Sequence, residues 1–224
     1  PSLILGIMAN QIIFPEHNPY PRNAFACSQA KQAVSLFHSN YRNRVDKTAL
    51  FLNYGQNPIT KSRYLEYACN NEVPYGENTI VAIMCYTGFN VEDAIIINRG
   101  SIDRGLFNTT KYAVYETHEE NIMIGGGKNN SKILNVYDPK HNVEGFKSGY
   151  DYSKLDENGL IRVGETINEK TILVGKAVMP MDADGAPTDD SVKPKKGETG
   201  IIDKAFITEG KEGTRIAKIR IRSI

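Results

Sequence analysis

The chain has 224 residues, of which 40% are hydrophobic and 24% charged, the balance of a globular chain that can bury a core. Its 27 Lys and Arg and 26 Asp and Glu leave a net charge of +1, which excludes a polycation that holds nucleic acid by bulk charge. No apolar run is long enough to span a bilayer. Three cysteines without a close pair argue against a disulfide framework or a zinc knuckle, so a reducing compartment fits best.

Both ends of the chain lie within structural patterns. The sequence begins at Pro1, directly before an apolar run, and closes inside an alternating strand pattern. We therefore expect a piece of a longer polypeptide, whose two ends pair with chain outside this sequence.

The first part of the chain mixes helical and strand patterns. Asn23 precedes apolar residues that recur every three or four positions, which predicts a capped helix over residues 24–41. Two continuous aliphatic runs, residues 79–86 and 94–98, predict strands buried on both faces. A glycine-containing turn at residues 87–93 joins them.

From about residue 109 the pattern changes to short strands separated by Gly, Asp and Asn. The three glycines Gly125–Gly127 predict a flexible connection. Residues 180–198, rich in Pro, Asp and Lys, predict a mobile loop. Residues 200–208 and 214–222 predict a closing hairpin. The expected fold class is therefore mixed α/β and rich in β-structure.

This change of composition divides the chain into three segments. Residues 1–108 form an α/β portion, residues 109–205 a β-rich insert, and residues 206–224 a return to the first portion. We expect two domains, one of them interrupted by the other.

Glu92 and Asp93 are the sharpest chemical feature, because they are adjacent carboxylates between a glycine turn and an aliphatic run. Two close like charges repel, most strongly where water is scarce, so a cation stabilises the pair. Oxygen-only ligands suit magnesium. The alternative is a hairpin turn whose acids point into solvent, the usual place of acidic side chains.

Basic and amide side chains suggest contacts with phosphates. Arg22 lies in a proline-rich loop directly before the predicted helix, where free backbone N–H groups and a guanidinium could together hold a triphosphate. It could equally bond loop carbonyls. Lys31 and Gln32 suit contact with a sugar–phosphate backbone, or form a solvated helix face.

The last predicted strand alternates, with Lys218, Arg220 and Arg222 on one face and small or aliphatic residues on the other. A basic ladder can track a nucleic-acid backbone. Basic residues on an edge strand also block aggregation, and the pattern does not decide between the two. The sequence contains no phosphate loop, dinucleotide fingerprint, nucleophile elbow or kinase signature.

Three stretches resemble the second-largest subunit of multisubunit DNA-directed RNA polymerases, in the form found in eukaryotes, archaea and large DNA viruses. They are PRNAFACSQAKQAV at residues 21–34, GFNVEDAII at residues 88–96 and SIDRGLF at residues 101–107. The resemblance covers residues 1–108 and, more weakly, residues 155–224. It implies that residues 1–108 and 206–224 belong to a hybrid-binding domain, part of a double-psi β-barrel, and that residues 109–205 are the inserted wall or flap.

The resemblance also implies roles for single residues. Glu92 and Asp93 match the acidic pair that faces the second, exchangeable Mg²⁺, which arrives with the nucleotide, and Arg22 matches an arginine that contacts the phosphates of the incoming NTP. Lys31 and Gln32 match residues near the RNA. The first Mg²⁺ is held by the largest subunit, so the metal is shared, and no zinc is expected in this part.

The implied activity is DNA-templated nucleotidyl transfer by a multisubunit complex, with this chain inactive alone. The implied partners are the largest subunit and other polymerase subunits, the DNA template, the RNA–DNA hybrid and the NTP, without a membrane. Localisation follows the source: the nucleus for a cellular eukaryote, the cytoplasm or virion for a large DNA virus.

Two other functions stay open. One is a non-catalytic nucleic-acid-binding or assembly module that keeps the fold and tolerates loss of the acidic pair. The other is a single-chain two-barrel polymerase, which requires an Asp-x-Asp-x-Asp motif in the same chain, and the 224 residues contain none.

Overall fold

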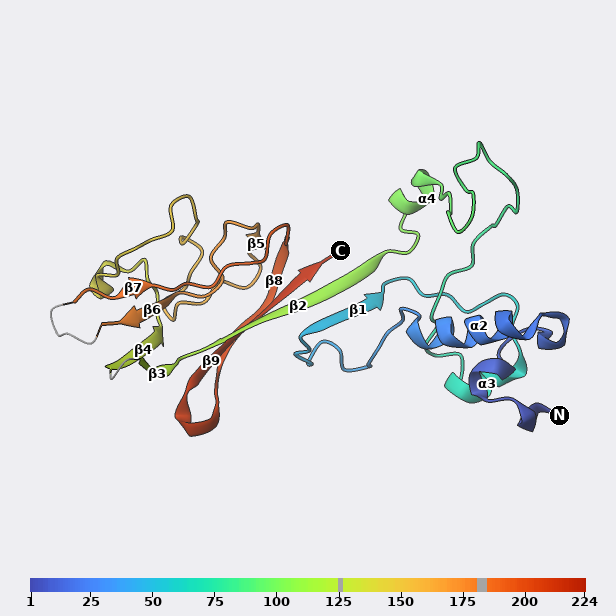
Figure 1. Cartoon of the computed structure of the whole chain (residues 1–224), viewed down its shortest axis with the longest axis horizontal. Coiled ribbons are helices and arrows are strands. Elements are labelled where there is room, and N and C mark those ends of the chain that lie inside the picture. The colour runs from blue at the N-terminus through green and yellow to red at the C-terminus, as the bar shows by residue number, and fades with distance from the viewer. Residues whose placement is uncertain (125–126, 181–184) are drawn as a thin grey trace. The chain divides into compact units, whose positions relative to one another are not determined.

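The computed structural model describes residues 1–124, 127–180 and 185–224 (Figure 1). Part of the predicted connection at Gly125–Gly127 and part of the predicted loop at residues 180–198 therefore lie outside the described residues. Over the described residues, no helix combines the length and the apolar character needed to cross a bilayer.

The chain divides into two compact units, and each is described by itself. The first unit comprises Pro1–Arg44 and Leu50–Thr110, and the second comprises Val45–Ala49 and Lys111–Ile224. The assignment of these parts to a hybrid-binding domain and a wall stays a prediction.

Short helices and irregular segments make up most of the first unit. Its regular elements are the helices α1 (Ile7–Asn10), α2 (Tyr20–Gln32), α3 (Arg63–Cys69) and α4 (Arg99–Asp103), the 3₁₀ turns Ser2–Ile4 and Pro15–His17, and most of strand β1 (Thr48–Leu52). Among the described residues of this unit, Leu65 is the only buried hydrophobic residue. The first unit by itself therefore has almost no hydrophobic core.

Helix α2 confirms the predicted helix but not its ends. It begins at Tyr20 and ends at Gln32, rather than spanning residues 24–41. Pro21 is tolerated in its first turn because no N–H donor is needed there. Asn23 lies inside the helix instead of capping it, and its Nδ2 donates to the carbonyl oxygen of Pro15 at 2.8 Å.

The two aliphatic runs at residues 79–86 and 94–98 do not form strands, so that prediction is wrong for this structure. Their side chains are exposed, Ile80 and Ile83 at 105% and 100% and Ile95 at 82%. A buried strand needs a neighbour for its backbone groups, and no strand in the described part of the chain pairs with either run. Apolar composition predicts burial but does not supply the partner.

Two sheets build the second unit, except that most of β1 and the first two residues of β2 belong to the first unit. One has the strand order β1-β2-β9-β8-β5 and the other the order β3-β4-β6-β7. The strands not yet given are β2 (Thr109–His118), β3 (Asn121–Ile124), β4 (Gly127–Ile133), β5 (Thr166–Ile167), β6 (Lys176–Met179), β7 (Thr188–Asp189), β8 (Gly200–Glu209) and β9 (Arg215–Ser223). Two 3₁₀ turns, Pro139–His141 and Lys211–Gly213, complete the elements of this unit.

The hairpin of β8 and β9 confirms the predicted closing hairpin. The two strands pair antiparallel, with Ile201 opposite Arg222 at one end and Glu209 opposite Arg215 at the other. On its other edge β9 pairs antiparallel with β2. In the structure residues 206–224 therefore belong to the same sheet and the same unit as β2 and β5.

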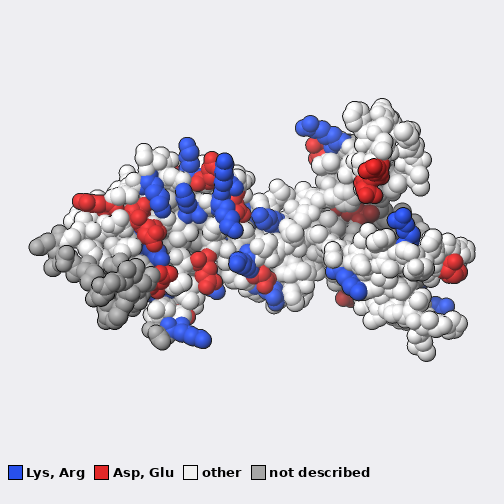
Figure 2. Space-filling view, in the orientation of Figure 1, with Lys and Arg blue, Asp and Glu red and all other residues white. Residues whose placement is uncertain are grey.

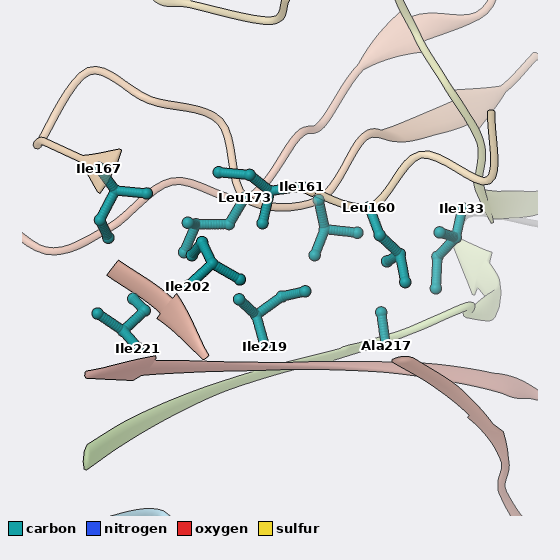
Figure 3. Close-up of a cluster of buried hydrophobic side chains, with 10 residues drawn as sticks. Ile133, Leu160, Ile161, Ile167, Leu173, Ile202, Ala217, Ile219 and Ile221 are labelled. Carbon is teal, nitrogen blue, oxygen red and sulfur yellow. The ribbon is translucent and has the colours of Figure 1, made fainter. Parts of the chain in front are cut away.

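One face of β9 forms the centre of a hydrophobic core. Ala217 and Ile219 are fully buried and Ile221 is 1% exposed. Figure 3 shows these side chains pointing from β9 toward aliphatic side chains of residues 160–174, the segment that covers this face of the sheet. The other members of the cluster are Ile133, Leu160, Ile161, Ile167, Leu173, Val174 and Ile202. The alternation predicted for the last strand is confirmed on this face.

Two glycines at the ends of this covering segment, Gly159 and Gly175, allow it to approach the backbone of Leu134 closely. Gly159 has φ +82°, and a Cβ there would lie 2.4 Å from the Leu134 carbonyl oxygen. A Cβ on Gly175 would lie 2.3 Å from the same oxygen. The backbone N–H of Gly175 donates to Gly159 O at 2.7 Å, and that of Leu134 donates to Gly175 O at 3.1 Å. Only glycine fits at these positions without moving the backbone.

The opposite face of β9 carries cations that are paired within the sheet. Arg220 is 3% exposed, its Nε donates to Asp203 Oδ2 at 2.7 Å, and its guanidinium lies 4.5 Å from the centroid of the Tyr112 ring. A register shift in β8 between Ile202 and Lys204 leaves Asp203 as the extra residue of a bulge. The bulge therefore aims a carboxylate at the buried guanidinium.

Prediction for the core. We expect Ile219→Ala to lower the free energy of unfolding of the second unit by about 3 kcal/mol, because a fully buried aliphatic side chain leaves a cavity. Urea titration with hydrogen exchange of the β8 and β9 amides measures this. Ile224→Ala, at a side chain that is 79% exposed, is the control and should change it little. Equal midpoints for the two variants would contradict the core described above.

Prediction for the buried ion pair. We expect Asp203→Ala to destabilise the second unit by on the order of 3 kcal/mol, because it removes a carboxylate from a buried guanidinium. Glu116→Ala removes the partner of Lys218, whose Nζ lies 3.1 Å from Glu116 Oε2 in a half-exposed pair, and should cost less than about 1 kcal/mol. The same urea titration compares them, and a Glu116 variant as unstable as the Asp203 variant would refute the assignment.

Candidate functional site

The acidic pair follows a turn that local hydrogen bonds hold in place. The Asn90 side chain accepts from the backbone N–H of Tyr86 at 3.0 Å and donates to the carbonyl oxygen of Met84 at 2.6 Å. Thr87 and Gly88 adopt the left-handed region, with φ of 58° and 77°. The turn is thus ordered by contacts within six residues, although its side chains face solvent.

Glu92 and Asp93 are both exposed, and neither carboxylate has a hydrogen-bond or ion-pair partner among the described residues. Glu92 has φ +61°, an uncommon conformation for a side chain of this kind. Unpaired acids of this arrangement are available to bind a cation from outside. They are also what the alternative of a solvated turn predicts, so exposure alone does not assign a role.

The metal-binding capacity of this pair is incomplete. No group of three or more His, Cys, Asp or Glu side chains is arranged around a common point in the part of the chain that the structure describes. Two carboxylates supply a share of the six oxygen ligands that Mg²⁺ takes in octahedral coordination. Any divalent ion held at Glu92 and Asp93 would therefore need further ligands from other groups.

Arg22 lies in the first turn of α2 and is exposed. Its guanidinium carbon lies 5.7 Å from the centroid of the Phe25 ring, one turn along the helix, which limits the side chain to one side of α2. Lys31 and Gln32 end the same helix and are exposed. A lysine in the last turn also interacts favourably with the helix dipole, the structural alternative for Lys31.

The structure does not bring the predicted phosphate and metal ligands into contact. Arg22, Glu92 and Asp93 all belong to the first unit, but no hydrogen bond or ion pair joins the arginine to either carboxylate among the described residues. Their proximity stays a prediction.

The predicted basic ladder is largely charge-balanced. Lys218 pairs with Glu116, and Arg220 is buried against Asp203. The side chain of Arg222 is half-buried and has no acidic partner among the described residues. Of the three, Arg222 thus keeps the most charge available for an external phosphate, and the nucleic-acid role of the ladder stays a prediction.

A small cavity in the first unit was not predicted from the sequence. It has a volume of about 140 Å³ and lies between α3 and residues 73–78, with Leu65, Cys69 and Tyr75 in its wall. Burial, together with the nearby Cys69 thiol, raises the pKa of Tyr75, whose hydroxyl donates to Gln11 Oε1 at 2.7 Å. The cavity is smaller than the roughly 300 Å³ of a typical ligand pocket, and no predicted site residue lines it.

Comparison with known proteins gives a consistent family. Residues 8–224 match the family described as RNA polymerase Rpb2, domain 6. The chain is 37% identical over its whole length to DNA-directed RNA polymerase subunit Rpo2 of Sulfolobus acidocaldarius. It is 36% identical to DNA-directed RNA polymerase II subunit RPB2 of Schizosaccharomyces pombe and 35% identical to DNA-directed RNA polymerase II subunit 2 of Arabidopsis thaliana, again over 100% of the chain.

The chain spans about a fifth of these relatives, namely 20% of the Sulfolobus subunit and 19% of each of the two eukaryotic subunits. The match confirms the resemblance read from the GFNVEDAII and SIDRGLF motifs, and extends it over residues that those motifs do not reach. With nearly the full sequence matched and more than a third of it identical to an archaeal subunit, the chain belongs to the Rpb2 domain 6 family of the second-largest RNA polymerase subunit.

Proposed function

We propose that this chain contributes to DNA-templated RNA synthesis as part of the second-largest subunit of a multisubunit RNA polymerase, and that it is inactive alone. The observation that carries the proposal is the turn ending in Glu92 and Asp93. Its two carboxylates are exposed and free of partners among the described residues, and they lie in a chain that matches polymerase subunits over its length.

The donor set at this turn fits a shared Mg²⁺. Glu92 and Asp93 offer oxygen ligands only, the kind that Mg²⁺ prefers, and they are too few to hold the ion without help. A Mg²⁺ bound there would neutralise negative charge on a nucleotide triphosphate. The contribution of this chain is to present two carboxylates from an ordered turn, with the remaining ligands coming from the largest subunit and the nucleotide.

Arg22 is proposed to bind the phosphates of the incoming NTP. Its guanidinium is exposed and offers several N–H donors in a planar fork that suits phosphate oxygens. The contact with the Phe25 ring restricts its position before the nucleotide arrives, which reduces the entropy lost on binding. Lys31 and Gln32, at the other end of α2, are proposed to lie near the RNA.

Several finer features belong to the same proposal. The first unit is proposed to form part of a double-psi β-barrel that binds the RNA–DNA hybrid, together with residues 206–224, and the second unit to include the wall or flap. The exposed aliphatic runs at residues 79–86 and 94–98 support the barrel, because apolar segments of this kind become strands when a partner pairs with them. The partners would be the other polymerase subunits and the DNA template.

The cations of β9 have different proposed roles. Arg222 is proposed to reach the nucleic-acid backbone, because no acid among the described residues neutralises it. Lys218 and Arg220 contribute to the same basic face, but their ion pairs mean that they first stabilise the sheet. Their effect on nucleic acid is therefore weaker than the sequence pattern indicates.

Prediction for the acidic pair. In the assembled polymerase, we expect Glu92→Ala with Asp93→Ala to slow elongation on the order of 100-fold at limiting Mg²⁺, since two charges that hold the ion are lost. Subunit assembly should be unchanged, because neither side chain has a partner in this chain among the described residues. Single-nucleotide addition across a Mg²⁺ titration measures the effect.

The matched control is Glu157→Ala with Glu209→Ala, which removes two other exposed acids. This variant should elongate normally. Normal elongation by the Glu92 and Asp93 variant at limiting Mg²⁺ would instead favour a non-catalytic nucleic-acid-binding or assembly module.

Prediction for Arg22. We expect Arg22→Ala to raise the NTP concentration for half-maximal elongation roughly 10-fold, the effect of losing one charge-assisted hydrogen bond of about 1.5 kcal/mol. Arg22→Lys should recover only part of the loss, because an ammonium cannot form the bidentate contact. The control is Arg99→Ala, at another exposed arginine of the first unit. An NTP dependence that is the same for all three variants and the unmodified enzyme would remove Arg22 from the site.

A further inference from the structure

A short lysine-rich segment of the second unit lies outside every site described above. Residues 193–196, with the sequence Lys-Pro-Lys-Lys, are called the lysine turn below. The side chains of Lys193, Lys195 and Lys196 are exposed, whereas Pro194 between them is buried. The segment is therefore anchored by its proline and presents its lysines to solvent.

Tyr115 of β2 holds the lysine turn from beneath. Its hydroxyl accepts the backbone N–H of Lys195 at 2.9 Å and donates to Glu198 Oε2 at 2.8 Å. Burial raises the pKa of Tyr115 above its ordinary value, which further favours the protonated hydroxyl that donates to the carboxylate. Tyr115 also packs against the hydrophobic core of the unit, which ties the turn to the rigid sheet.

Further bonds close the turn. The backbone N–H of Glu198 donates to Lys195 O at 3.1 Å, and Gly197 between them has φ +78°. The N–H of Gly197 donates to Glu169 Oε2 at 3.3 Å. At its other end, Lys193 Nζ donates to the Tyr150 hydroxyl at 2.8 Å and lies 4.8 Å from the centroid of that ring. These bonds order residues 193–198 without a partner, so the prediction of a mobile loop over residues 180–198 is wrong for this part.

The two acidic groups next to the turn contact other groups than Lys195 and Lys196. Glu198 takes the Tyr115 hydroxyl on one oxygen and lies 3.6 Å from Lys111 Nζ with the other. Glu169 faces the backbone of Gly197. Neither Lys195 nor Lys196 has an acidic partner among the described residues. The turn therefore exposes positive charge that nothing in this part of the chain neutralises.

Further lysines without an acidic partner lie on the same unit. Figure 2 shows Lys and Arg side chains, with Asp and Glu among them, over the part of the second unit where Figure 1 labels β5 and β8, and the lysine turn ends three residues before β8. Lys204 in β8 and Lys170 beside Glu169 also lack an acidic partner among the described residues. Clustered, unpaired cations on an ordered surface attract a polyanion, and they gain affinity by releasing its counterions.

We propose that the lysine turn is a binding site for the phosphodiester backbone of nucleic acid, through Lys195 and Lys196, with Lys193 beside them. The inference rests on the proposed function, since a polymerase surface meets both RNA and DNA strands. It adds a contact on the second unit that is separate from Arg22, the acidic pair and the β9 ladder. A lysine contacts phosphates as a point charge, so the site carries no base specificity.

The test uses the complete polymerase with Lys195→Ala and Lys196→Ala, bound to a labelled RNA–DNA scaffold across a salt titration. Each lost phosphate contact lowers the slope of log affinity against log salt by about 0.7 to 0.9, so the double variant should lose about 1.4 to 1.8. Charge reversal, Lys195→Glu with Lys196→Glu, should weaken binding further at low salt. A slope equal to that of the unmodified enzyme in both variants would overturn the proposal.

The matched control is Lys140→Ala with Lys211→Ala, which removes two exposed lysines elsewhere on the second unit. Lys211 lies in the turn after β8, at the far end of that ten-residue strand from the lysine turn. The control should keep the slope of the unmodified enzyme. An equal loss in the control would assign the effect to net charge alone and would also overturn the proposal.

A photoreactive residue at position 196 identifies the strand. RNA is labelled in one arm and DNA in the other, and a cross-link in either arm supports the site and names its source. Cross-linking to protein alone would overturn it. The proposed function fails separately, through normal elongation by the Glu92 and Asp93 variant, which a change of salt slope at the lysine turn does not affect.

Discussion

Strand β9 is the constraint on which the second unit depends, because it pairs with β8 and β2 and uses both of its faces. Ala217, Ile219 and Ile221 bury one face, and Arg220 fills the other between Asp203 and the Tyr112 ring. Burying a charged guanidinium to 3% exposure is costly unless other groups replace its water, and here a carboxylate and an aromatic face do so. The bulge at residue 203 therefore allows β8 to pair with β9 and at the same time places a carboxylate beside the buried guanidinium.

The sequence predicts one face of β9 better than the other. Alternation of period two is local, so burial of Ala217, Ile219 and Ile221 follows directly from the pattern. The partner of Arg220 is not local, because Asp203 becomes its neighbour only through a one-residue register shift in β8. A row of basic residues in a sequence therefore shows which side chains share a face, but not how much of their charge remains for a ligand.

In the first unit, the sequence predicts the locally ordered elements but not the structure of the aliphatic runs. Its helix α2 and its acidic turn depend on contacts within a few residues, such as those of Asn90 with Tyr86 and Met84. The sequence therefore predicts both, except for the ends of the helix. The aliphatic runs at residues 79–86 and 94–98 depend on partners that the described chain does not provide, so their side chains stay exposed. Hydrophobic patterning predicts that a segment will be buried, whereas the covering surface comes from elsewhere in the fold.

This difference bears on how the parts of the proposed site form. The turn before Glu92 and Asp93 is ordered by its own hydrogen bonds, so its conformation does not wait for a neighbour. The position of these carboxylates relative to Arg22 is not fixed in the same way, because the side chains of the segments that flank the turn are exposed and unpacked. The lysine turn, in contrast, is held in place within this chain, because Tyr115 connects it to the hydrophobic core of the second unit. If the proposals hold, chemistry that requires several groups at one point depends on the assembled polymerase, whereas the phosphate contact proposed for the lysine turn requires only ordered charge on the second unit.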